Sequence, residues 1–178
     1  MRAVRLFSYD DGYFVATLSP EERAVLASIA GEVQGMVRGE APPSLDVLPS
    51  LKRLFPPASM DDGDIARDFA SLTGRSLRET KDRRLGRLAE RLARGAIRLD
   101  HTEAGETVAA LNDLRLAIAE ILRIETADDA EQVYATLADR DEPVGERDVF
   151  GEVYVALSVL QESLVAALEA AAAHGRTG

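Results

Sequence analysis

The hydrophobic and polar positions of the first forty residues follow two different periods. Residues 2–7 (RAVRLF) and 13–18 (YFVATL) are rich in β-branched and aromatic side chains, and an Asp-Asp-Gly turn sequence separates them. This pattern predicts a β-hairpin within residues 2–18. Residues 19–22 (SPEE) then combine a capping serine, a proline suited to the first helical turn and a glutamate three residues after the serine. They predict a helix whose apolar side chains recur three and four positions apart until Gly39.

Five of the seven prolines fall within residues 39–61, which we interpret as a connector with a short helical piece near 50–55. After it, apolar residues with a 3.6-residue period predict a helical body over residues 62–172. The helices expected in this body are 62–73, 77–94, 100–123, 126–138 and 147–172. Residues 97–99 (IRL) predict a third strand that joins the hairpin, and the polar tail 173–178 is expected to fray.

Together these elements predict a mainly α protein, with one helical-bundle-like domain over residues 1–178 and a small N-terminal β-hairpin. A chain of 178 residues can bury a substantial core without a disulfide or a metal. The lack of cysteine excludes disulfides, thiolate nucleophiles and zinc–thiolate sites, and it fits a reducing cytoplasm. The sequence has no signal-peptide core and no run of about 18 apolar residues. We therefore expect a cytoplasmic protein that does not contact a membrane.

Charge is distributed unevenly along the chain. The 21 basic and 31 acidic side chains give a net charge of −10, yet residues 75–98 carry 9 basic and 3 acidic side chains. Four arginines of this segment form one stripe of the predicted helix: Arg83, Arg87, Arg91 and Arg94. We favour the interpretation that the stripe is solvated or pairs with the acidic C-terminal half. The alternatives are that the stripe binds nucleic-acid phosphates or an acidic protein partner. No interleaved aromatic residue supports base stacking.

A second polar cluster combines residues of two predicted helices. Asn112, Asp113 and Arg115 belong to the segment LNDLRL, and Gln161 and Glu162 interrupt the apolar final helix. Arg115 falls inside the apolar arc of its helix, where an unpaired charge is costly. We therefore expect Arg115 to pair with a carboxylate, and Glu162 is the candidate. A structural role for the cluster is favoured, and a role facing a ligand or partner is the alternative.

The final predicted helix is apolar on almost all sides. Its side chains at three- and four-residue spacing include Leu157, Leu160 and Leu164, in the pattern of a coiled-coil seam. Such a helix is either the central helix of the fold or lies with one side against a second subunit. We favour the central helix and keep the homodimer seam open as an alternative.

Sequence signals for catalysis, metals and cofactors are poor. There is no glycine-rich phosphate loop, no histidine pair with metalloprotease spacing and no nucleophile elbow. His101 and His174 have no spacing partner, and residues 61–64 (DDGD) lack the further ligands of a calcium loop. We therefore predict no catalytic, cofactor-binding or metal-binding residue, and we expect that the protein is not an enzyme.

Several segments together resemble a known family. They are LSPEE at 18–22, FxxLT at 69–73, LRxxK at 77–81, LNDLRL at 111–116 and LQESLV at 160–165. With the Asp-Asp-Gly hairpin, they make the chain similar to an actinobacterial family with a domain of unknown function. This family is linked to AosR-like regulation of oxidative-stress transcription and is often encoded beside the adaptor of the Clp protease. The resemblance covers nearly the whole chain.

The resemblance implies a non-enzymatic regulator that acts through RNA polymerase or a sigma factor. A thiol-based redox switch is excluded, because the chain has no cysteine. We therefore favour a regulatory protein that works by protein–protein contact, with homodimer formation as an open alternative. The other hypotheses are a nucleic-acid-binding regulator that uses the basic helix 77–94, and an enzyme of unrecognised type around Asn112, Arg115 and Glu162.

Overall fold

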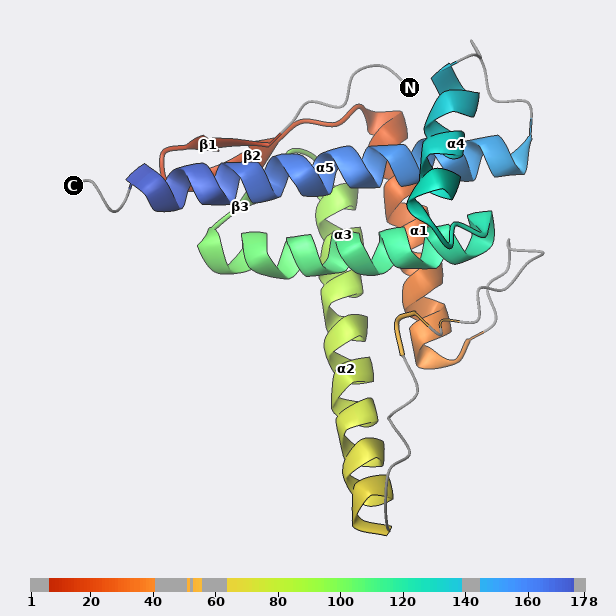
Figure 1. Cartoon of the computed structure of the whole chain (residues 1–178). Coiled ribbons are helices and arrows are strands. Elements are labelled where there is room, and N and C mark those ends of the chain that lie inside the picture. The colour runs from red at the N-terminus through yellow and green to blue at the C-terminus, as the bar shows by residue number, and fades with distance from the viewer. Residues whose placement is uncertain (1–6, 41–50, 52, 56–63, 139–144, 175–178) are drawn as a thin grey trace.

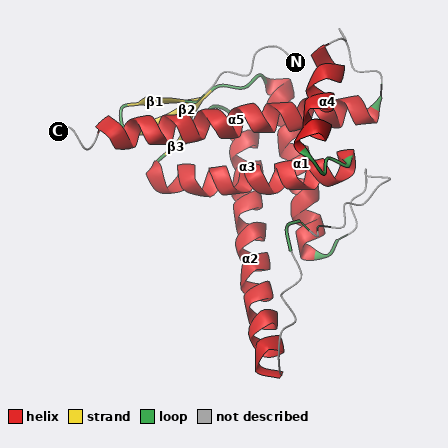
Figure 2. Cartoon of the chain, in the orientation of Figure 1, coloured by secondary structure: helices red, strands yellow, loops and turns green. Residues whose placement is uncertain are grey.

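Five helices and three short strands make up the part of the chain that the computed structural model describes, residues 7–40, 51, 53–55, 64–138 and 145–174 (Figures 1 and 2). The strands are β1 (Ser8–Asp10), β2 (Tyr13–Ala16) and β3 (Ile97–Leu99). The helices are α1 (Pro20–Arg38), α2 (Asp64–Arg94), α3 (His101–Leu122), α4 (Ala127–Ala138) and α5 (Glu146–His174). This architecture confirms the predicted mainly α fold with a small N-terminal β-element.

Some predicted features lie outside the described residues. They are the start of the first strand before Phe7, most of the connector, and the last four residues of the tail. The beginning of the second predicted helix before Asp64, which includes the first three residues of the segment DDGD at 61–64, also lies outside them. Of the predicted helical piece near 50–55, residues 53–55 form a turn in which the N–H groups of Leu54 and Phe55 donate to the carbonyl of Leu51. This turn places Leu54 in the core.

Side-chain caps set where α1 and α3 begin. The Ser19 hydroxyl accepts a hydrogen bond from the Glu22 N–H, and the Glu22 carboxylate accepts one from the Ser19 N–H, as predicted. Asp100 and Glu103 form the same reciprocal pair at the start of α3. Each cap satisfies N–H groups that the helix itself leaves unpaired. The caps thereby fix the first turn of two helices whose apolar faces build the core.

The three strands form one antiparallel sheet in the order β1-β2-β3. Asp11 and Gly12 connect β1 to β2 with positive φ angles of 44° and 81°, as two-residue hairpin turns favour. β3 pairs with β2, with Leu99 opposite Phe14, and this confirms the predicted third strand. Phe14 and Leu99 are both fully buried, so one face of the small sheet lies on the core.

α1 and α2 pack as an antiparallel pair, and Gly86 of α2 allows their close approach. A Cβ atom at Gly86 would lie 2.6 Å from Nε2 of Gln34, which is closer than real side chains permit. The same Gln34 amide donates to the carbonyl of Asp82 at 3.1 Å and to its carboxylate at 2.7 Å. Asp82 also pairs with Nε of Arg38 at 2.8 Å. The side chains of Gln34, Arg38 and Asp82 therefore fix the register of the two helices beside Gly86.

α2 is one continuous helix of 31 residues, which corrects the prediction of two separate helices over 62–73 and 77–94. The predicted break between them, residues 74–76 with Gly74, lies inside α2. Glycine in a helix interior costs only about 1 kcal/mol relative to alanine, so it weakens a helix without ending it. The N-terminal part of α2 extends beyond the end of α1 (Figure 1).

α3 and α5 run side by side and cross the α1–α2 pair (Figure 1). The core between them includes Leu114 of α3 and the three leucines of the predicted seam, Leu157, Leu160 and Leu164, all of which are buried. These three side chains are covered within a single chain. They are not available to a second copy, which corrects the alternative of a homodimer seam at this position.

α5 also has the length and apolar composition of a membrane-spanning helix over Arg147–Ala173. Length and composition alone do not separate a spanning helix from the core helix of a soluble protein, which is apolar on several sides because it packs against several neighbours. In this fold α5 packs against α3, α4, β1 and β2.

α4 is the least embedded helix, and none of its residues is buried. Gly151 of α5 faces it, and a Cβ at this position would be in ordinary contact, at 3.4 Å, with side-chain atoms of Val133 and Leu137. Tyr134 of α4 also meets Tyr154 of α5 edge to face, with ring centroids 6.4 Å apart. α4 is therefore attached through one face to the N-terminal half of α5.

The burial of α5 predicts the cost of truncating its side chains. Leu157→Ala removes a fully buried leucine and should lower the free energy of unfolding by about 2 to 5 kcal/mol. Val149→Ala in the same helix should cost less than about 1 kcal/mol, because Val149 is 42% exposed. Urea denaturation of the two variants and the wild type measures both values. Equal losses would contradict the placement of Leu157 in the core.

Candidate functional site

The most buried charged pair among the described residues joins two of the segments that carry the family resemblance. Lys81 of the LRxxK segment in α2 lies 2.5 Å from Oδ1 of Asp113 of the LNDLRL segment in α3, measured from Nζ. Their side chains are only 12% and 5% exposed. Oδ2 of Asp113 has no hydrogen-bond partner within the described residues. The pair links the α1–α2 layer to the α3–α5 layer, so it has a structural role.

The expected partnership of Arg115 and Glu162 is not found in the described part of the chain. Arg115 is half-buried rather than buried, and Glu162 is exposed. The buried charge of the LNDLRL segment is Asp113 instead, which is two residues before Arg115 and therefore lies on roughly the opposite side of the helix. Of the other cluster members, Asn112 is half-buried, and Oε1 of Gln161 is buried without a hydrogen-bond partner among the described residues.

The LQESLV segment also contributes to the fold. The Ser163 hydroxyl accepts a hydrogen bond from the N–H of Phe7 at 3.2 Å and donates one to the carbonyl of Leu160 at 2.9 Å. Leu160 and Leu164 on either side of it are buried. Ser163 therefore joins the chain just before β1 to the centre of α5. The two most specific segments of the resemblance both contain residues that hold the layers together.

The basic stripe of α2 is largely neutralised by carboxylates. Arg87 pairs with Glu106 and Arg91 with Glu103, both on α3, while Arg94 pairs with Glu90 one turn earlier in α2. Only Arg83 of the four is exposed without an ion pair in the described part of the chain. This is the arrangement of the favoured interpretation, in which the stripe pairs within the chain. Each pair lowers the positive potential that a phosphate backbone would meet.

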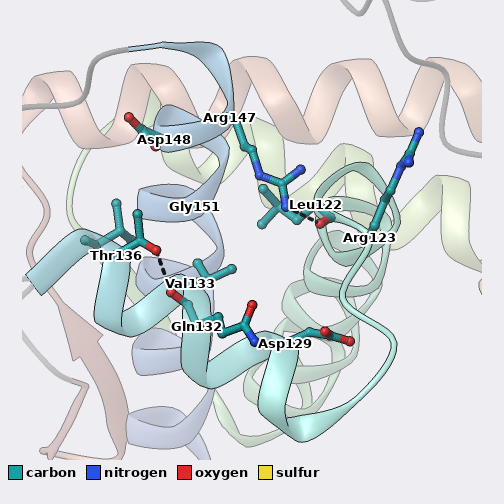
Figure 3. A pocket seen from close by; sticks show the side chains of 10 residues that line it. Leu122, Arg123, Asp129, Gln132, Val133, Thr136, Arg147, Asp148 and Gly151 are labelled. Atoms are coloured by element: carbon teal, nitrogen blue, oxygen red, sulfur yellow. Dashed lines mark hydrogen bonds between the residues drawn. The ribbon is translucent and has the colours of Figure 1, made fainter.

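A polar cavity of about 140 Å³ lies where the end of α3, α4 and the start of α5 meet (Figure 3). Arg147 reaches across from α5 and donates to the carbonyl of Leu122, the last residue of α3, at 2.9 Å. Asp129 is held by the N–H groups of Glu125 and Thr126 and by the Thr126 hydroxyl. Both charged groups therefore serve helix ends, and we assign no reaction to this cavity.

A second, apolar groove of about 150 Å³ separates the N-terminal halves of α1 and α5. The buried side chains of Leu26 and Val153 lie beside it, and Val25 and Val149 line it while remaining 43% and 42% exposed. Both valines are already more than half buried, so covering the rest would contribute only part of the roughly 1.5 to 3 kcal/mol that full burial of an apolar side chain is worth. An apolar groove is the default candidate for a binding site. We take this groove as the candidate functional site.

The groove was not predicted from the sequence. Val25 lies at the edge of the apolar face of the first predicted helix, so the sequence predicts that it faces the core. No signal in the sequence separates Val25 from the core residues of this helix, because Val25 and Leu26 lie about 100° apart on the helical wheel, within the width of an ordinary core-facing stripe. Val149 gives no such signal, since it lies in a helix that is apolar on nearly every side.

The fold and its surface define a small, mainly α-helical protein with a three-stranded antiparallel sheet and an exposed apolar groove. The chain belongs to a protein family described as a domain of unknown function (DUF2017), whose sequence model matches residues 1–168. Membership in a family of this kind confirms the predicted resemblance at that level. Comparison with curated proteins and with solved structures finds no match.

The buried pair allows a test of its structural role. Lys81→Met leaves Asp113 buried without a counter-ion and should lower the free energy of unfolding by about 3 to 5 kcal/mol. The double variant Lys81→Met with Asp113→Leu removes both charges and should recover most of that loss. Chemical denaturation measures both variants. A single variant within about 1 kcal/mol of the wild type would show that the pair does not hold the layers together.

Asp129 predicts a pH-dependent stability of α4. Hydrogen bonds from the backbone N–H groups of Glu125 and Thr126, and from the Thr126 hydroxyl, hold the pKa of Asp129 below its ordinary value. A lowered pKa stabilises the folded state above the unfolded pKa of about 4, and this contribution is lost as the pH falls through the folded pKa.

At neutral pH, Asp129→Asn should therefore increase the rate of amide hydrogen exchange in α4 relative to the wild type, and the difference should shrink as the pH falls below about 4. Asp128→Asn is the matched control, because Asp128 is exposed in the same helical turn. Comparison of the variants at the same pH cancels the dependence of the intrinsic exchange rate on pH. Equal protection in both variants at neutral pH would contradict the prediction.

Proposed function

We propose that the protein is a non-enzymatic regulator that acts by binding another protein, and that the groove between α1 and α5 is its docking site. The observation that carries the proposal is the pair of exposed valines, Val25 and Val149, on opposite walls of an apolar groove. A cavity of about 150 Å³ admits a group the size of benzene, so the groove has room for one large apolar side chain. This is the size of an anchor residue in a protein interface.

The roles of the polar residues support this proposal over an enzyme. Lys81, Asp113 and Ser163 make contacts that hold the fold together. Asn112, Arg115 and Glu162, around which an unrecognised active site was the alternative, line neither the polar cavity nor the apolar groove. An active site needs titratable groups that converge on a cavity, and this cluster lacks such a cavity among the two described above.

The resemblance supplies the candidate partner. AosR-like regulation implies an action on transcription, so we propose RNA polymerase or a sigma factor as the first partner to test, with the protein in the cytoplasm. The signal to which such a regulator responds is not a thiol oxidation within this chain, because the chain has no cysteine. A signal that consists of the presence of a partner, or of a change in concentration, needs no thiol chemistry.

Site-specific photocrosslinking tests the docking site. A photoreactive amino acid replaces Val25 or Val149 in the full chain, and irradiation in the source cell is followed by mass spectrometry of the crosslinked products. We expect the same partner protein from both positions, with RNA polymerase subunits or a sigma factor as the first candidates. Purified RNA polymerase with and without sigma factor then serves as the defined probe in the same crosslinking reaction.

Ala24 is the matched control position, because it is exposed on α1 beside Val25 but does not line the groove. Crosslinks to one protein from Val25 and Val149, and their loss at Ala24, would support docking in the groove. No product from the two groove positions, or the same products from Ala24, would overturn it.

A further inference from the structure

We propose that α4 is a hinged lid, which swings away from the N-terminal half of α5 as one unit while the other described elements stay packed. The inference concerns a conformational change, and it does not depend on the docking site proposed above. Three observations support it: α4 is held weakly, the chain is anchored immediately before it, and the surface beneath it is joined without its help.

α4 is held to the fold along one narrow stripe. None of its residues is buried, and its half-buried apolar residues are Ala130, Val133 and Leu137, three and four positions apart. Its main contacts are with α5. Tyr134 adds an edge-to-face contact with Tyr154 but remains 40% exposed. Segments that are held by few buried apolar contacts are the ones that open locally in native proteins.

The chain is anchored immediately before α4, and this places the hinge. Ile124 is buried, and its N–H donates to the carbonyl of Ala119 at 2.9 Å, so the chain stays attached to the end of α3 up to this residue. Glu125, the next residue, is exposed. Its backbone N–H already belongs to the cap of α4, where it donates to the Asp129 carboxylate at 2.9 Å. The hinge therefore lies in the backbone between Ile124 and Glu125.

The cap of α4 is local and moves with the helix. The Asp129 carboxylate accepts a hydrogen bond from the Thr126 N–H at 2.8 Å, and the Thr126 hydroxyl accepts one from the Asp129 N–H at 3.2 Å. The Thr136 hydroxyl donates to the carbonyl of Gln132 within the same helix. None of these bonds has to break when α4 leaves α5. A free helix of this length is marginal in water, so its amides exchange rapidly once it has left.

The surface beneath α4 is joined without it. Arg147 near the start of α5 donates to the carbonyl of Leu122 at the end of α3, at 2.9 Å. Leu114 and Leu157, which are fully buried, belong to the core that α3 and α5 share. Part of the inner side of α4 lies over the polar cavity of about 140 Å³ instead of against apolar side chains (Figure 3). α4 can therefore leave without breaking the contact between α3 and α5.

Opening of the lid changes the surface that α5 presents. Gly151 and Tyr154, which face α4 in the closed form, become exposed, and the polar cavity opens to solvent. Val149 and Val153 of the same stretch of α5 line the groove on its α1 side. The N-terminal half of α5 therefore offers one apolar surface when the lid is closed and two when it is open. α4 thereby controls how much of this helix another molecule can contact.

A disulfide that locks the lid tests the inference in the full chain. Val133→Cys and Gly151→Cys are combined, because a Cβ at Gly151 would lie 3.4 Å from Cγ1 of Val133, within reach of a disulfide. The natural chain has no cysteine, so no other thiol competes. Hydrogen exchange followed by mass spectrometry compares the oxidised and reduced forms of this variant, and the reduced form is the matched control.

The exchange rate of α4 is the quantity that decides. In the wild type and in the reduced form, we expect α4 to exchange about tenfold or more faster than α3, because α4 opens on its own. Oxidation should slow the exchange of α4 by about tenfold or more, because the locked lid opens only with the rest of the fold.

A second pair of variants keeps the test independent of disulfide formation. Leu137→Ala removes a contact with α5 at Gly151 and introduces a residue of high helix propensity, so it weakens docking without weakening the helix. It should speed the exchange of α4 by about fivefold and leave α3 unchanged. Glu131→Ala is the matched control, because Glu131 is exposed on α4. The control should leave the exchange of α4 within about twofold of the wild type.

Three outcomes would overturn the inference. Exchange of α4 as slow as that of α3 in the wild type would show that the two helices open only together. Equal exchange of α4 in the oxidised and reduced forms, with the disulfide confirmed by mass spectrometry, would show that α4 unfolds in place. Equal effects of Leu137→Ala on α4 and α3 would assign both helices to one cooperative unit.

Discussion

The ion pair between Lys81 and Asp113 is the interaction on which the arrangement of the two helical layers depends. It is the most buried charged contact of the described residues, and it lies where the α1–α2 pair crosses α3. Apolar contacts between helices tolerate small rotations and shifts, but a buried lysine and a buried carboxylate are costly unless they meet. The pair therefore favours the crossing of the layers at which Lys81 and Asp113 meet.

Local signals in the sequence predict the elements of this fold well. The capping box of α1, the Asp-Asp-Gly hairpin and the third strand each depend on a few neighbouring residues, so each can be predicted from a short stretch of sequence. Gly74 shows the limit of such signals, because whether a helix continues through a glycine depends on stabilisation along its whole length. The site shows the limit more clearly. Helical periodicity identifies Arg115 as an awkward charge but does not show that α2 presents Lys81 to Asp113 instead.

The segments that carry the family resemblance turn out to contain residues that hold the molecule together. Ser19 caps a helix, Arg78 donates to the carbonyl of Val37 at the end of α1, Lys81 and Asp113 join two layers, and Ser163 binds the chain before β1. The groove is built in part from one of these segments, because Leu18, Glu21 and Glu22 of LSPEE line it, and Glu22 also completes the cap of α1. Val25 and Val149, its exposed apolar residues, lie outside the segments.

The hydrogen bond between Phe7 and Ser163 joins residues that are 156 positions apart in the chain. A ribosome adds about 5 to 20 residues each second, so the N-terminal segment waits roughly 10 to 30 s before its partner helix exists. β1 and β2 emerge first, yet the helices that cover their apolar face come late, and contacts of such long sequence separation form slowly. The small sheet should therefore be covered only after α5 has been synthesised, with the hairpin exposed to chaperones in the meantime.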